Sequence, residues 1–306
     1  MSSIVILGIF VADTAYRAER IPRLGETILG ESFNLSPGGK GSNQAVAAAK
    51  AGANAHMITR LGKDTFADMA LDIWQKAGVT PAITQHDNSY TGAACIFVEA
   101  ESGNNAIIVT PGVAGQIDNS DIDRNAELIA DADIFITQLE QPLGAAMHGL
   151  ELARKNGVRT LLNPAPAAKL PDGMLALCDY VTPNETEAEG LTGVKVTSVE
   201  SAIEAAKALR AAGAGAAIIT LGENGALYHD ADTTIHVPVM PSGKVIETTG
   251  AGDSFNGSFA AAIAEGMTAI EAVKFGCAAA GISVTRAGAA DSMPSRAEID
   301  ARLAQG

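Results

Sequence analysis

The sequence predicts an α/β protein: a doubly wound, mostly parallel sheet flanked by helices, with a second, small β-sheet. Three observations support this fold class. Short apolar runs typical of buried parallel strands alternate with helical segments along most of the 306 residues. Polar residues follow the ends of these apolar runs. Residues 14–37 and 91–110 instead form extended pieces broken by turn residues.

The first strand is expected at residues 4–7, an apolar run that ends at Gly8. A glycine-rich loop at 38–41 opens a helix that reaches residue 51. Further strands are expected at 56–59, 134–137, 159–162, 180–183 and 217–220, and an extended run at 234–239. Helices are expected at 64–77, 119–130, 143–155, 197–212, 259–265, 268–284 and from 295 onward, several of them behind capping residues.

The two extended stretches interrupt this alternation. Residues 91–98 and 106–109 flank the polar tip 101–105, which is typical of a hairpin. We therefore expect one core, formed by residues 1–13, 38–90 and 111–306. Residues 14–37 and 91–110 would pair as a β-sheet lid over the polar edge of that core.

The bulk composition excludes some classes of partner. A net charge of −14 argues against nucleic acid, although backbone N–H groups and a metal ion could still hold a small phosphate compound. No apolar run reaches membrane-spanning length, and the first residues lack the pattern of a signal peptide. Three scattered cysteines are typical of buried thiols in a reducing compartment. These features favour a cytoplasmic protein without a membrane partner.

The most informative stretch is 248–257, which precedes an alanine-rich helix. Gly250, Ala251 and Gly252 leave the N–H groups at the helix start uncovered, so an anion could bind there. Asp253 among those N–H groups would stay ionised and could face a nucleophile that approaches the anion. An anion-binding helix start with a carboxylate beside it suits phosphoryl transfer. The alternative interpretation is a tight turn with an ordinary helix cap.

Other polar residues should share a crevice with this loop, because the carboxyl ends of parallel strands meet at one edge of the sheet. These residues are Asp13, Asn163, Asn184, Thr220 and Asp253. Asn184 and Glu187 could face the same way at a helix start and suit Mg²⁺ through water. Alternatively, Asn184 is an ordinary cap and Glu187 a solvated surface charge.

A second glycine-rich loop, 37–44, offers Lys40 and Asn43 as hydrogen-bonding groups for several hydroxyls. It lacks the spacing of a P-loop, because Gly41 follows Lys40. A flexible turn is the alternative.

Five motifs occur in one order along the chain: 38–44 (GGKGSNQ), 163–166 (NPAP), 182–187 (TPNETE), 220–222 (TLG) and 250–253 (GAGD). Together they resemble the ribokinase (PfkB-type) family of carbohydrate kinases, nearly from end to end. The resemblance implies a ribokinase-like fold and ATP-dependent transfer of the γ-phosphate, with Mg²⁺, to a primary hydroxyl of a small sugar. It also implies that the β-sheet lid forms a homodimer contact.

Carried over from the family, Asp253 would be the general base, and Gly250, Ala251 and Gly252 would form the anion hole. Asn184 would contact the nucleotide phosphates, and Glu187 would position Mg²⁺ through water. The residues that would lie along the nucleotide are Thr220, Gly222, Gly225 and Gly252. The sugar would be held by Asp13, Gly39, Lys40, Asn43, Glu140 and Asp253.

Two positions depart from the family pattern. Val11 stands where members that act on ribose have asparagine, so a sugar lacking one hydroxyl could suit the site better. Glu247 stands where many members have the aspartate that binds a monovalent cation such as K⁺. By resemblance the rest of that cation site would comprise Thr249, Ser283, Arg286, Gly288 and Ser292.

The leading hypothesis is a kinase that converts D-ribose to ribose 5-phosphate. The alternatives are a kinase of the same family for 2-deoxyribose, another sugar or a nucleoside, and a non-catalytic sugar or nucleotide sensor. A dinucleotide-dependent oxidoreductase is disfavoured, because no GxGxxG follows the first strand.

Overall fold

The computed structural model describes residues 2–305, and within them the core is a nine-stranded sheet of order β13-β12-β11-β10-β9-β8-β1-β4-β5. The strands are β13 (Thr234–Val237), β12 (Ala226–His229), β11 (Ala216–Thr220), β10 (Tyr180–Val181), β9 (Arg159–Leu162), β8 (Ile134–Thr137), β1 (Ser3–Leu7), β4 (Asn54–Gly62) and β5 (Thr80–His86). Only the β11–β12 and β12–β13 pairs in this sheet are antiparallel. The predicted α/β fold class is confirmed.

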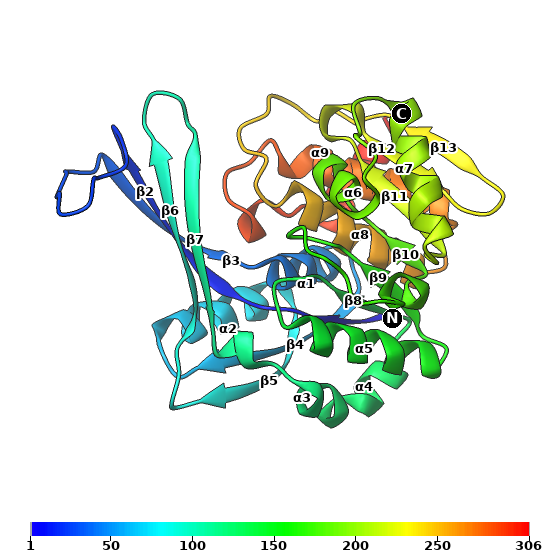
Figure 1. Cartoon of the computed structure of the whole chain (residues 1–306), viewed down its shortest axis with the longest axis horizontal. Helices are drawn as coiled ribbons and strands as arrows, with labels where there is room; N and C mark the ends of the chain where they lie inside the picture. Colours follow the sequence, from blue (N-terminus) through cyan, green and yellow to red (C-terminus); the bar gives the residue numbers. More distant parts are fainter. Residues whose placement is uncertain (1, 306) are drawn as a thin grey trace.

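Helices cover both faces of the sheet (Figure 1). One face packs against α1 (Lys40–Lys50), α2 (Thr65–Ala77), α8 (Ala251–Ala264), α9 (Ala269–Ser283) and α10 (Arg296–Leu303). The other face packs against α3 (Asn119–Arg124), α4 (Ala126–Ala130), α5 (Leu143–Lys155), α6 (Glu185–Thr192) and α7 (Val199–Ala211). Short 3₁₀ turns are η1 (Val113–Gln116), η2 (Met174–Leu177), η3 (Gly222–Asn224) and η4 (Ala290–Ser292).

A separate four-stranded sheet of order β3-β2-β6-β7 projects from the core at the left of Figure 1. Its strands are β3 (Ser32–Gly38), β2 (Val11–Ala18), β6 (Thr91–Glu99) and β7 (Asn105–Gly112). The predicted hairpin is confirmed as β6–β7. The expected position of Asp13 was wrong. This residue lies within β2 of the small sheet rather than just past the end of β1. The exact division of the chain into core and lid stays a prediction.

Several local features differ from expectation, among them the following three. Strand β5 was not predicted, because it lies at the sheet edge and contains Pro81, which interrupts the sequence pattern of a strand. Residues 119–130 form two helices because the Asn125 side chain bonds the Asp121 carbonyl at 2.8 Å and competes with the helix. Cys95 is exposed, whereas Cys178 and Cys277 are buried as expected.

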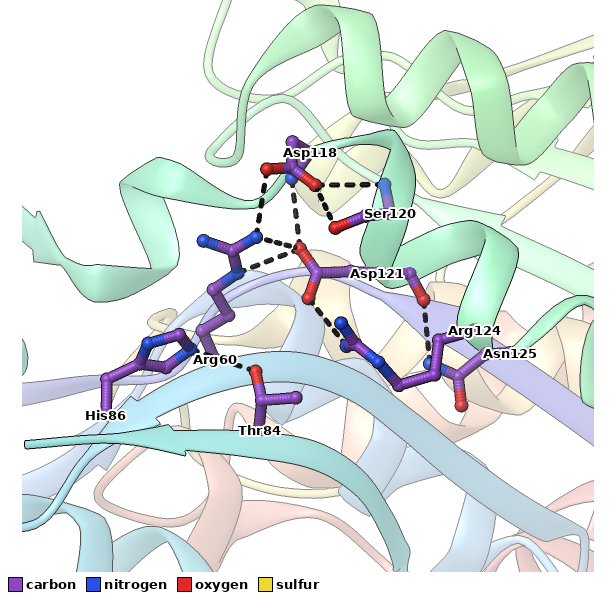
Figure 2. A network of polar contacts seen from close by, with 8 residues as sticks. All are labelled: Arg60, Thr84, His86, Asp118, Ser120, Asp121, Arg124 and Asn125. Atoms are coloured by element: carbon purple, nitrogen blue, oxygen red, sulfur yellow. Dashed lines mark hydrogen bonds and ion pairs between the residues drawn. The ribbon is translucent and has the colours of Figure 1, made fainter.

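An ion-pair network attaches α3 to the sheet (Figure 2). The Arg60 guanidinium of β4 donates to Asp121 at 2.8 Å and pairs with Asp118 at 3.1 Å. Asp118 also caps α3, and Arg124 bonds the other oxygen of Asp121 at 3.1 Å. The side chains of Arg60 and Asp121 are only 11% and 6% exposed, so these bonds satisfy charges that burial would otherwise destabilise.

None of the helices formed by residues 2–305 is both long enough and apolar enough to cross a membrane.

Candidate active site

Close packing of α1 against α8 sets the geometry of the candidate site. A Cβ atom on Gly257 would stand 2.7 Å from the Ala47 Cβ atom and 2.8 Å from the Ala48 nitrogen, and nearer still to the Gln44 carbonyl oxygen. Only glycine permits this approach. As a result, the first turn of α8 lies against the first turn of α1.

This packing places Asp253 between two amide side chains. Asn43 donates to one oxygen of the Asp253 carboxylate at 3.0 Å, and Gln44 donates to the other at 3.0 Å. The sequence suggested that Asp253, among the helix N–H groups, would stay ionised; in the structure the hydrogen-bond donors to its carboxylate come from α1. Burial raises the pKa of Asp253, although Lys40 and both amides oppose that rise. Asp253 is therefore a stronger proton acceptor than an exposed aspartate.

The start of α8 offers backbone donors beside this carboxylate. Gly250 precedes the helix in the left-handed region at φ 78°, and the Ala251 N–H donates to the Thr248 carbonyl at 3.2 Å. The N–H groups of Gly252 and Asp253 have no acceptor among residues 2–305. A Cβ atom on Gly252 would meet nothing within 4 Å, so the space beside this residue is open. Free N–H groups at a helix start can bind an anion.

Lys40 lies among carboxylates at the start of α1. Gly39 caps this helix at φ 89°, and a Cβ atom there would stand 2.6 Å from the Ile9 carbonyl oxygen. The backbone N–H of Lys40 donates to the Glu140 carboxylate at 2.7 Å. Burial alone would lower the pKa of the Lys40 ammonium, but Asp253, Glu140 and Glu187 outweigh burial and raise it. The lysine therefore stays charged.

Two further acids adjoin this cluster. Asp13 lies over Gly38, where a Cβ atom would stand 2.5 Å from the carboxyl carbon of Asp13. Burial, with help from the Asp253 charge, raises the pKa of Asp13 to about 6. Burial raises the pKa of Glu140 to about 7, against the opposing charge of Lys40. The structure thus brings these two expected sugar contacts into one electrostatic cluster with Lys40 and Asp253.

Asn184 and Glu187 form a reciprocal capping box at α6. The Asn184 side chain accepts from the Glu187 N–H at 2.8 Å, and Glu187 accepts from the Asn184 N–H at 2.9 Å. Asn184 is therefore a helix cap, as the alternative interpretation held. Glu187 is not a solvated surface charge, because it is 8% exposed and burial raises its pKa. A buried carboxylate offers the oxygen ligands that Mg²⁺ accepts, directly or through water.

The expected nucleotide contacts lie next to α6. Thr220 ends β11 and forms a parallel bridge with Asn184. Gly222 and Gly225 bound the following turn with φ of 52° and 88°. A Cβ atom on Gly225 would stand 2.6 Å from the Pro238 backbone, so only glycine fits. Their contact with a nucleotide stays a prediction.

The expected cation-site residues are partly gathered. The Glu247 carboxylate accepts from the Gly288 N–H at 2.9 Å, which joins the two loops behind the start of α8. The hydroxyls of Ser283 and Ser292 donate to carbonyls within their own turns. The Arg286 guanidinium instead donates a hydrogen bond to the Glu298 carboxylate of α10. Thr249 is exposed.

Within the described part of the chain, no three acidic, histidine or cysteine side chains converge as a metal site. A divalent cation near Glu187 would therefore need ligands from water and from a bound phosphate compound. This requirement agrees with the preference of Mg²⁺ for water and phosphate ligands.

One residue at this site had no role assigned from the sequence. Gln44 is fully buried and contacts Asp253, Asn163 and Gln138. Its place in the glycine-rich motif directly after Asn43 was the available signal. A glutamine one position along a helix from a predicted ligand would usually point elsewhere, so only the packing of α8 reveals its contact.

The comparisons with known proteins agree with this geometry. Residues 1–296 match the model described as pfkB family carbohydrate kinase. The chain belongs to this family. It is 38% identical to the ribokinase of Haemophilus influenzae over 297 residues, which cover 97% of this chain and 96% of that protein. It is 37% identical to the deoxyribokinase of Salmonella typhi, over 95% of each chain.

Solved structures give the same result. The structure of Arabidopsis thaliana ribokinase complexed with ribose and ATP superimposes with a TM-score of 0.93 at 30% identity, over 99% of each chain. Ribokinase from Thermotoga maritima superimposes with a TM-score of 0.90 at 34% identity, over 99% of this chain and 100% of that chain. The whole architecture, including the small sheet, is therefore a known one.

The raised pKa values of Asp13 and Glu140 make stability depend on pH. A buried acid whose pKa is raised on folding stabilises the protein while it is protonated, and that contribution is lost as pH rises through its folded-state pKa. For Glu140 this window runs from about 4.5 to about 7. We expect the unfolding free energy of the ligand-free protein to fall less across this window in Glu140→Gln than in the wild type. Urea unfolding measured at several pH values tests this, and parallel curves would contradict it.

Proposed function

We propose that this chain is an ATP-dependent sugar kinase that transfers a phosphoryl group to the primary hydroxyl of a pentose, converting D-ribose to ribose 5-phosphate. The observation that carries the proposal is the buried Asp253 carboxylate beside the free N–H groups of α8, in a chain of the pfkB family. Ribokinases from several organisms, at 32–38% identity over nearly the whole chain, support ribose as substrate.

In this reaction Asp253 accepts the proton of the attacking hydroxyl. Its raised pKa suits that role, since a stronger base takes the proton more readily. The N–H groups of Gly252 and Asp253, together with Gly250 and Ala251 at the helix start, hold the transferred phosphoryl group. Lys40 adds positive charge where the negative charge of the phosphoryl group accumulates.

The nucleotide lies along Thr220, Gly222 and Gly225, with its phosphates near Asn184. Mg²⁺ bound to ATP would neutralise phosphate charge, and Glu187 would hold that ion through water. A monovalent cation behind α8, near Glu247 and Gly288, would reinforce the positive end of this helix. Comparing the rate of phosphoryl transfer in KCl with the rate in choline chloride tests whether the reaction depends on this monovalent cation.

The sugar is held at the junction of the core and the small sheet, by Asp13, Gly39, Lys40, Asn43 and Glu140. The Oδ1 atom of Asn43 supports this placement, because it is buried and has no hydrogen-bond partner in the described chain. A buried acceptor without a partner destabilises the protein until a donor reaches it. A sugar hydroxyl is such a donor.

The first experiment removes the proposed base. We expect Asp253→Ala to lower kcat at least about a hundredfold, because proton transfer by a positioned carboxylate contributes on that order. ATP binding should persist, since the variant leaves the nucleotide contacts intact. An assay coupled to ADP release measures kcat, and the thermal shift caused by MgATP measures binding. Near-full turnover would remove Asp253 from this role and with it the proposed mechanism.

One residue favours a second candidate substrate, 2-deoxyribose. Val11 and Asp13 are two residues apart in β2 and therefore share a face. Val11 is 4% exposed and offers no hydrogen bond to a sugar hydroxyl on that face. A hydroxyl buried against valine would lose a bond worth about 1–3 kcal/mol, a loss that 2-deoxyribose could avoid. The similarity to a deoxyribokinase agrees with this alternative.

The Val11→Asn variant separates the two substrates. We expect the ratio of kcat/KM for ribose to that for 2-deoxyribose to rise about tenfold, because the new amide can bond the additional hydroxyl. Steady-state kinetics with both sugars measures this ratio. An unchanged ratio would exclude Val11 as the source of selectivity.

The small sheet is the proposed homodimer contact. Tyr16, Phe33, Leu35 and Ile108 lie on one face of it by strand register and are 41–69% exposed. Asp13 lies on the opposite face by the same register. An apolar face turned away from the site suits a second copy of the chain.

Ile108→Lys places a charge in that contact. We expect the variant to be monomeric at concentrations where the wild type is dimeric, because burying an unpaired charge is unfavourable. Light scattering after size exclusion measures the mass, and Gln75→Lys on the exposed surface of α2 serves as the control. A wild-type monomer, or a dimeric Ile108→Lys variant, would exclude this contact.

A cytoplasmic location stays a prediction.

A further inference from the structure

Gln44 stands at the junction of three buried polar side chains. Its amide nitrogen donates to Asp253 Oδ1 at 3.0 Å and to Asn163 Oδ1 at 3.0 Å. Its carbonyl oxygen accepts from Gln138 Nε2 at 2.6 Å. The side chain has no solvent exposure, so these three bonds use its whole hydrogen-bonding capacity except one lone pair.

A backbone group fixes the direction of these bonds. The carbonyl oxygen of Thr182 can only accept, and Asn163 Nδ2 donates to it at 3.0 Å. The Asn163 amide must therefore turn its oxygen toward Gln44. Gln44 must in turn present its NH₂ group, whose second hydrogen reaches Asp253. A rotated Gln44 amide would place oxygen against the oxygens of both Asn163 and Asp253.

The same carboxylate receives its other donor from the neighbouring residue of α1. Asn43 Nδ2 bonds Asp253 Oδ2 at 3.0 Å, so each oxygen of the carboxylate is held by one amide. Asn43 is also a proposed sugar contact, whereas Gln44 lies behind Asp253 among protein groups. Among the residues proposed above to act on the substrates, Gln44 bonds only Asp253, so we expect it to act on the reaction through Asp253.

We propose that Gln44 is a positioning residue for phosphoryl transfer. Its amide holds the Asp253 carboxylate in the orientation that receives the hydroxyl proton, and it stabilises the ionised form of that carboxylate. This inference rests on the function proposed above, in which Asp253 is the base. It adds to that function a residue that contacts neither substrate.

The test replaces Gln44 with methionine, which has similar length and cannot donate. We expect kcat to fall about tenfold to a hundredfold, as for the loss of one hydrogen bond to a charged group. The KM for ATP should change less than about twofold, since the Asp253 side chain is proposed to act on the sugar hydroxyl and not on the nucleotide. The acidic limb of the kcat–pH profile should move to higher pH by about one unit, because the lost donor favoured the ionised carboxylate.

Gln141→Met is the matched control. Gln141 is also buried and donates to Thr137 and to the Gln138 carbonyl, each at 2.6 Å, but has no bond to Asp253. Its loss should lower the unfolding temperature without moving the acidic limb. If both variants moved the limb equally, the effect would be one of general destabilisation and the proposal would fail.

Gln44→Glu is the second variant, for the case in which methionine prevents folding. It keeps the shape of the side chain, but once ionised it cannot donate and repels Asp253. We expect its kcat to be lowered and to decline further as pH rises. The proposal is overturned if a folded Gln44 variant keeps wild-type kcat and pH profile while Asp253→Ala is inactive. If Asp253→Ala is itself active, the proposed function fails instead.

Discussion

The contact between α1 and α8 at Gly257 is the constraint on which the candidate site depends. These helices come from opposite ends of the chain, yet the missing side chain at Gly257 lets their backbones nearly touch. The approach brings Asp253 within hydrogen-bonding distance of Asn43 and Gln44. Any larger residue would separate the helices, and the carboxylate would then be buried without partners, which is strongly unfavourable.

The site concentrates negative charge in the absence of substrate. Four carboxylates, those of Asp13, Glu140, Glu187 and Asp253, have their pKa values raised by burial, and Lys40 is the cation that acts on three of them. Such a cluster destabilises the ligand-free fold. Sites that must bind charged or polar ligands often reduce stability in this way, because their groups are arranged for the ligand rather than for one another. Sugar hydroxyls and a metal-bound nucleotide would supply the missing partners.

The alternation of apolar runs and helices was enough to predict the doubly wound sheet and the separate small sheet. The errors have local causes. Pro81 masked an edge strand, and the Asn125 side chain divided an expected helix. Asp13 was expected at the end of β1, because the pattern does not show that the chain passes directly into another sheet there. Cys95 is exposed, and its strand β6 belongs to the small sheet rather than to the core sheet that helices cover on both faces.

By itself the sequence determined the class of the protein, and it predicted most of the polar residues that the structure gathers at the candidate site, because each motif combines a backbone requirement with a chemical group. Gly39 and Gly250 meet the requirement for positive φ, and Lys40 and Asp253 carry the charge beside them. Only the tertiary structure decided which group faces which. The partners of Asp253 and the burial of Glu187 arise from contacts between elements far apart in the chain. Hydrogen bonds and desolvation depend on those distances, which no local pattern specifies.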